Sequence, residues 1–187
     1  TTVAPGVYIV VPAQSTVNWA GKKPLLSGYI NQGSIALKSG SISVTDTTAQ
    51  GSFIIDMNTL SVTQTPTKPG QESRLAEHLM GERWFNVSAH PTATFTINEV
   101  TKLPDSDETF VYMINGSLTM KGKTNPLSFP ATIYTDANNN LKATASLEFN
   151  RTLWDITSGS ASFFDGLADN VIDDMVSLSF DLTATPQ

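Results

Sequence analysis

The chain has 187 residues and a formal net charge of −6, a size that suits one domain with a sizeable core. Hydrophobic residues make up 40% and charged residues 15%, which excludes a disordered chain. No apolar run approaches the ~20 residues of a membrane-spanning helix. The eleven lysines and arginines are scattered along the sequence, so nucleic acid is not an expected partner. The absence of cysteine excludes disulfides and thiol catalysis.

The first third of the chain alternates apolar and polar residues with a period of two, which is typical of half-buried β-strands. Pro12 separates two short strands, and Ser39-Gly40 interrupts a long one. The expected strands are, in order, 6–11, 15–21, 28–44 and 51–57. A loop rich in proline and glycine follows over 63–72.

One short helix is expected over 74–80. Leu75 and Leu79 lie four residues apart, as do Ala76 and Met80, which places an apolar stripe on one side of a helix. Ser73 stands where an N-cap is expected and Gly81 where a left-handed stop is expected. Trp84 and Phe85 follow directly. We therefore expect the helix and this aromatic pair to close one end of a β-structure.

The second half of the chain returns to the strand pattern. An acidic tip is expected over 104–108, a polar hairpin tip over 136–140 and an irregular segment over 158–174. The expected strands are 93–100, 110–120, 127–133, 141–149 and 176–183. No repeat or linker divides the chain, so residues 1–187 are expected to form one domain.

About eight strands with one apolar face, and a single short helix, predict an all-β fold. We expect a single antiparallel lipocalin-like barrel whose closure removes the strand edges. A two-sheet sandwich would produce the same alternation, but long strands and a lone helix favour the barrel. The interior of an eight-stranded barrel either packs solid or holds one small ligand.

The two histidines, His78 and His90, are not accompanied by a Ser/His/Asp order, an HExxH motif or a nucleophile elbow. We therefore expect no catalytic residue, no metal and no cofactor. The Asp165–Asp174 segment carries oxygen ligands of the kind calcium takes, but it lacks the EF-hand spacing. A solvated acidic loop is the favoured interpretation.

Arg74 and Arg151 both stand beside apolar residues. A partly buried guanidinium needs an anionic or polar partner. An internal carboxylate or backbone carbonyl is the favoured partner, and a ligand head group is the alternative. With His78, these two arginines are the candidates for a polar contact at a cavity mouth.

The large apolar residues on the inward face would line a cavity if the barrel is not filled by its own side chains. These candidates are Val17, Trp19, Ile35, Leu37, Phe53, Ile55, Phe95, Ile97, Phe110, Tyr112, Ile114, Leu118, Met120, Phe129, Leu147, Phe149, Leu178 and Phe180.

Three stretches resemble the YceI-like, polyisoprenoid-binding family: R-x-x-E-H-L to H-P-T-A-T-F over 74–95, G-S-L-T-M-K-G-K-T-N-P over 116–126, and N-R with G-S-A-S-F-F-D-G-L-A-D-N-V-I-D-D over 150–174. The resemblance implies a lipocalin-like barrel with a helix near one end. It also implies an apolar tunnel for a long isoprenoid chain, such as a polyprenyl phosphate or a quinone tail, in the bacterial periplasm or cell envelope.

The expected function is therefore non-enzymatic binding or carriage of a long-chain isoprenoid lipid. Two alternatives stay open: a solid-core envelope or stress-response interaction module without a small ligand, and an enzyme acting on a lipid. A monomer and a homodimer are both compatible with the sequence. An export signal, if the protein has one, is not part of this chain.

Overall fold

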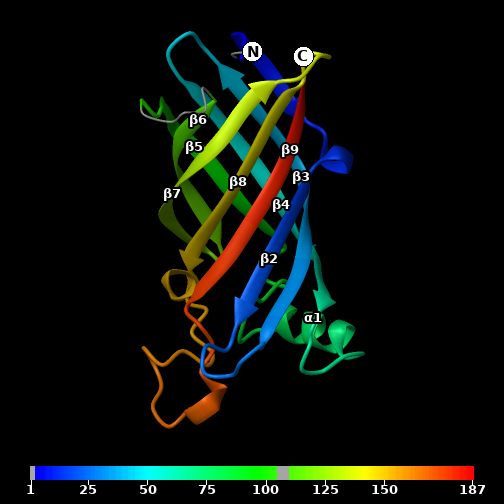
Figure 1. Cartoon of the computed structure of the whole chain (residues 1–187), viewed down its shortest axis with the longest axis vertical. Helices are drawn as coiled ribbons and strands as arrows, with labels where there is room; N and C mark the ends of the chain where they lie inside the picture. Colours follow the sequence, from blue (N-terminus) through cyan, green and yellow to red (C-terminus); the bar gives the residue numbers. More distant parts are fainter. Residues whose placement is uncertain (1–2, 105–109) are drawn as a thin grey trace.

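The computed structural model describes residues 3–104 and 110–187, and most of the acidic tip expected over 104–108 lies outside them. Within that part of the chain, nine strands form one closed antiparallel barrel (Figure 1). They are β1 (Gly6–Val10), β2 (Thr16–Lys22), β3 (Ile30–Val44), β4 (Ala49–Gln64), β5 (Thr92–Lys102), β6 (Val111–Met120), β7 (Lys123–Thr135), β8 (Leu141–Asn150) and β9 (Met175–Pro186). Pairing of β3 with β4 closes the ring.

β1 and β2 share a single position in the ring, so the barrel has eight strand positions. β1 pairs with one end of β3 and β9, while β2 pairs with the other end of the same two strands. The short 3-10 helix η1 (Pro12–Gln14) lies between them, because Pro12 has no N–H to donate to a neighbouring strand. The expectation of an all-β antiparallel barrel of about eight strands is confirmed.

β3 and β4 are the longest strands, and β4 departs most from its expected bounds. The expected break at Ser39-Gly40 is a register shift between Leu37 and Ser39, and β3 continues through it. β4 does not end at Met57 but continues to Gln64, with Leu60 buried. Two further register shifts interrupt the pairing of β3 with β4. A register shift inserts an unpaired residue and turns the following side chains to the other face, which hides a long strand from a simple alternation test.

Helix α1 (Glu72–Met80) lies at one end of the barrel, beside β4 (Figure 1). It begins before Ser73, so the prediction that Ser73 caps it is wrong. Gln71 holds the cap position and makes no side-chain cap bond. Gly81 is extended, with φ −70° and ψ 170°, so the left-handed stop is also wrong.

The chain after α1 folds back across the end of the helix and replaces the left-handed stop. The backbone N–H of Phe85 donates to Leu79 O at 3.0 Å, and that of Val87 donates to Met80 O at 2.9 Å. These bonds satisfy carbonyls that a helix C-terminus otherwise leaves free. The return carries Trp84 into a buried position, where it is 8% exposed.

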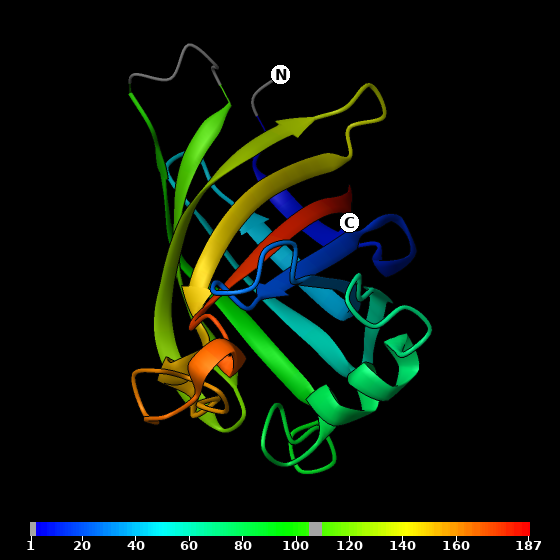
Figure 2. The same cartoon turned by 60° about the horizontal axis from the view of Figure 1, so that its bottom comes forward.

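Two further short 3-10 helices, η2 (Arg151–Trp154) and η3 (Ala168–Asn170), lie in the connection from β8 to β9. This connection and the loop between β2 and β3 occupy the same end of the barrel as α1, as Figure 2 shows. We call it the α1 end. The opposite end, which carries the β3–β4 turn, is the distal end.

Candidate functional site

The barrel interior contains two adjoining cavities. The distal cavity has a volume of about 430 Å³ and the α1-end cavity about 360 Å³, and both volumes lie within the range of small-molecule sites. Four residues line both cavities: Val17, Ile55, Leu118 and Leu178. We call these four residues the waist, because the two cavities meet there. Together the cavities run along the barrel interior from the distal end to α1.

The predicted lining residues divide between the two cavities, apart from the four of the waist. Nine line the distal cavity: Leu37, Phe53, Phe95, Ile97, Tyr112, Ile114, Phe129, Leu147 and Phe180. Four line the α1-end cavity: Trp19, Ile35, Met120 and Phe149. Phe110 lines neither, and its ring packs against Tyr134 with the ring centres 6.4 Å apart. β6 begins only at Val111, so the strand alternation does not extend to Phe110.

Aromatic rings cross the wall of the distal cavity in a continuous series. Phe95 contacts Phe53 and Phe129, with ring centres 6.4 and 5.6 Å apart, and Phe129 contacts Phe180 at 5.8 Å. Tilted and edge-on ring pairs of this kind add stability beyond the apolar area that they bury. The series gives the cavity a rigid apolar wall.

The charged residues lining the two cavities differ in number and sign. Of the charged residues in the described part of the chain, Lys102 and Asp46 line the distal cavity. The α1-end cavity is lined by four cationic side chains and one carboxylate: Lys22, Lys23, Lys68, Arg151 and Asp173. The sequence did not indicate the three lysines, because the end of β2 with its following loop and the loop before α1 come together only in the folded chain.

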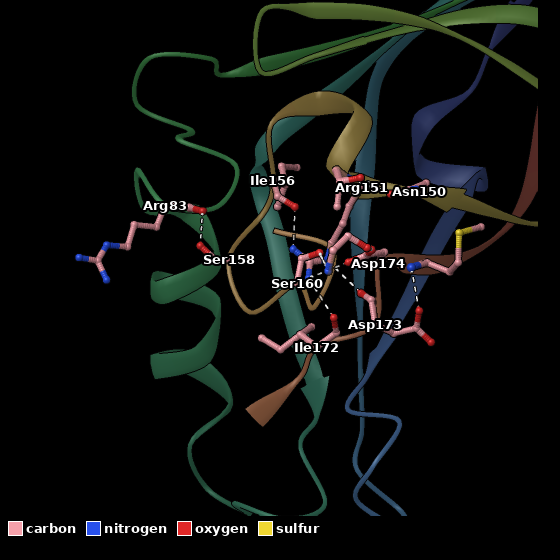
Figure 3. A network of polar contacts seen from close by, with 12 residues as sticks. Arg83, Asn150, Arg151, Ile156, Ser158, Ser160, Ile172, Asp173 and Asp174 are labelled. Carbon is pink, nitrogen blue, oxygen red and sulfur yellow. Dashed lines mark hydrogen bonds and ion pairs between the residues drawn. The ribbon is translucent and has the colours of Figure 1, made fainter. Parts of the chain in front are cut away.

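Arg151 is 1% exposed and has internal partners (Figure 3). Its Nε donates to Asp173 O at 2.9 Å, Nη1 to Ile156 O at 2.6 Å and Nη2 to Ile172 O at 3.1 Å. Burial lowers the pKa of Arg151, and the carboxylates of Asp174 and Asp173 oppose that shift. These contacts hold the two ends of the β8–β9 connection together. Because they use N–H groups of Nε, Nη1 and Nη2, the guanidinium has few donors left for a ligand.

The other two head-group candidates differ from Arg151 and from each other. Arg74 is exposed and lines neither cavity. His78 is exposed but lines the α1-end cavity, and its Nε2 accepts from Trp84 Nε1 at 3.1 Å. The bond with Trp84 therefore holds the His78 ring beside the α1-end cavity.

The acidic loop residues have separate surroundings. Asp174 accepts from Ser162 Oγ at 2.7 Å and lies 3.8 Å from Arg151 Nη2. Burial raises the pKa of Asp174, but hydrogen bonds from Ser160 and Ser162 and the charge of Arg151 outweigh burial, so the pKa lies below its usual value. Asp173 pairs with Lys22 at 3.5 Å. Over residues 3–104 and 110–187, no three histidine, aspartate or glutamate side chains gather where they could hold a metal.

No helix in the described part of the chain is both long and apolar enough to cross a membrane. A closed antiparallel barrel with an apolar interior and a helix at one end belongs to the lipocalin-like class of β-barrels. The chain is a member of the YceI-like family, whose domain model matches residues 8–184.

Known proteins similar to the chain agree with this family. A UPF0312 protein of Pectobacterium atrosepticum is 46% identical over 55 residues, a match that spans 29% of this chain and only 26% of that protein. BcnA of Burkholderia cenocepacia has the same fold, with a TM-score of 0.68 and 22% identity over 94% of this chain and 99% of its own. A polyisoprenoid-binding domain from Saccharophagus degradans matches with a TM-score of 0.68 and 15% identity, over 98% of this chain and all of that domain.

Proposed function

We propose that this protein binds and carries one long-chain isoprenoid lipid. The apolar chain of the lipid runs from the α1-end cavity through the waist into the distal cavity. The observation that carries this proposal is the pair of adjoining apolar cavities. Burial of apolar surface contributes about 25 cal/mol per Å², so an insoluble chain is stabilised along the whole tunnel.

The solid-core alternative is less well supported, because the predicted core positions surround open space. Kinship with a domain described as polyisoprenoid-binding adds support for an isoprenoid ligand. We place this carrier in the periplasm or cell envelope, as a monomer or a homodimer with one tunnel per chain.

The protein acts without catalysis in this proposal. The carboxylate and the imidazole that line the α1-end cavity already have structural partners: Asp173 pairs with Lys22, and His78 accepts from Trp84. General acid–base catalysis needs a group held within reach of the substrate and free to exchange its proton. Among the described residues, the α1-end lining therefore holds no carboxylate or imidazole without a partner.

Native mass spectrometry of protein purified from its own host tests the proposal. We expect one lipid per chain, with masses that differ by whole isoprene units. The same sample measured under denaturing conditions is the control, because the lipid must dissociate when the barrel unfolds. The proposal is contradicted if the measured native mass equals that of the protein alone, both before and after lipid extract is added.

A further inference from the structure

The two ends of the tunnel differ in their charge, although the chain as a whole is acidic. Lys22, Lys23 and Lys68 line the α1-end cavity, and Lys22 and Lys68 are exposed. Side chains that are both exposed and part of a cavity lining stand at its mouth. Of the described residues that line the distal cavity, Lys102 is balanced by Asp46. The lining of the α1-end cavity therefore carries a charge of the opposite sign to the net charge of −6.

The contacts of Lys22 and Lys23 hold both side chains near the mouth, and one of the two lysines has no carboxylate partner. Lys23 Nζ donates to Asn170 Oδ1 at 3.4 Å and lies 4.7 Å from the ring centre of Tyr29. Neither partner carries a charge. Lys22 is the one that pairs with a carboxylate, Asp173, at 3.5 Å. Lys23 and Lys68 thus keep their charge available, and Lys68 belongs to the loop that leads into α1.

Arg151 adds a buried positive charge to the same cavity lining from another element. Its N–H groups are directed to backbone carbonyls, so Arg151 contributes charge while the lysines contribute the hydrogen-bond donors. His78 lines the same cavity, with its Nε2 accepting from Trp84 Nε1. Lysines beside a further cation favour an anionic oxygen, because charge-assisted hydrogen bonds are the stronger class.

On the basis of the proposed function, we propose that the lipid enters tail first and leaves an anionic oxygen head group at the α1-end mouth, beside Lys23 and Lys68. The shared chemistry is a phosphate or carboxylate on a single apolar chain. The distal cavity receives the end of the tail. The proposal thus specifies the orientation of the lipid in the barrel and the chemical class of its head group.

Three probes with the same chain separate the sources of this chemistry: geranylgeraniol, geranylgeranyl phosphate and geranylgeranoic acid. We expect wild-type protein to bind one or both anionic probes about tenfold more tightly than the alcohol, which corresponds to ~1.4 kcal/mol. The probe with the larger gain identifies phosphate or carboxylate. Lys23→Gln and Lys68→Gln are each expected to reduce that preference about threefold. Lys38→Gln makes the same change of charge at an exposed residue outside both cavities and is expected to leave the preference unchanged.

The tryptophans report the direction of the ligand independently. Trp19 and Trp84 line the α1-end cavity, and Trp154 belongs to the same hydrophobic cluster. Bromine quenches indole fluorescence at short range. Hexadecanoic acid brominated beside the carboxylate is therefore expected to quench more strongly than the same acid brominated at the far end of its chain.

Equal affinity for the alcohol and both anions, or stronger quenching by the tail-brominated acid, overturns the head-group site while leaving the tunnel intact. The site is also overturned if Lys38→Gln loses the anion preference as Lys23→Gln and Lys68→Gln do. The preference would then depend on the net charge of the protein and not on the mouth. No binding of any probe contradicts the proposed function, and the head-group site with it.

Discussion

The guanidinium carbon of Arg151 lies 5.1 Å from the ring centre of Trp84. Arg151 opens the β8–β9 connection, and Trp84 comes from the return after α1. Both residues are buried, and a cation over an indole face is attracted by the ring. This contact joins two segments that line the α1-end cavity.

Arg151→Met is expected to lower the free energy of unfolding by about 3–5 kcal/mol, the range for removing one partner of a buried charged network. Three backbone carbonyls, of Ile156, Ile172 and Asp173, would lose their donor. Urea denaturation followed by tryptophan fluorescence measures the change. Arg74→Met is the control, because Arg74 is exposed and a change there should stay within ~0.5 kcal/mol. Equal stability of the two variants would show that the network does not hold the loop.

Gly116→Ala is expected to destabilise the barrel by about 1–3 kcal/mol, the cost of overpacking a filled position. A Cβ at Gly116 would clash with Phe95 Cζ and lie 2.5 Å from Thr96 O, so the aromatic series of the distal cavity must shift. A Cβ at Gly21 would meet nothing within 4 Å. Gly21→Ala is therefore the matched control, and the midpoints of urea denaturation compare the two. A neutral Gly116→Ala would mean that Phe95 moves freely.

Asp174 is expected to make the stability depend on acid pH. Its pKa is lowered in the folded chain because hydrogen bonds from Ser160 and Ser162 and the charge of Arg151 outweigh burial. A lowered carboxyl pKa contributes stability that is fully present above the unfolded value of about 3.9 and is lost as pH falls through the folded value. The melting temperature of Asp174→Asn should thus fall less steeply below pH ~4 than that of wild type. Asp165→Asn, at an exposed position, should follow wild type, and parallel curves for all three would refute the role of Asp174.

Much of the barrel could be predicted because a strand with one buried face has an apolar residue at every second position. That signal located Phe53, Phe95 and Phe129 in the wall of the cavity. It failed at Phe110, which precedes its strand, and along β4, where register shifts change the face of the following residues.

Local signals were less reliable where a tertiary contact could replace them. Gly81 was expected to end α1, but the returning chain at Phe85 and Val87 satisfies its last carbonyls instead. Ser73 was expected to cap the other end, but α1 begins one residue earlier, and Gln71 at the cap position makes no side-chain bond. The gathering of Lys22, Lys23 and Lys68 around one cavity depends on the closure of the barrel. No spacing along the sequence encodes it.

Ile55→Trp is expected to narrow the waist and to shorten the longest prenyl chain that binds. Ile55 lines both cavities, so a larger ring there separates them, while a short chain still fits into one. Thr96→Trp adds the same ring at an exposed position on the neighbouring strand β5 and should leave the limit unchanged. Circular dichroism confirms that both variants fold. An unchanged length limit in Ile55→Trp would show that the chain does not pass the waist.

Titration of wild-type protein with prenyl alcohols of increasing length tests the tunnel most directly. At roughly 0.3 kcal/mol per non-hydrogen atom, a twenty-carbon chain gains about 6 kcal/mol and a forty-carbon chain about 12. These values correspond to dissociation constants of tens of micromolar and about nanomolar. We expect the affinity of these uncharged probes to rise with length until the two cavities are filled. It should change less than about threefold between ~50 and ~500 mM salt, because screening acts on exposed charges. An affinity that ignores length, or no binding at any length, contradicts the tunnel.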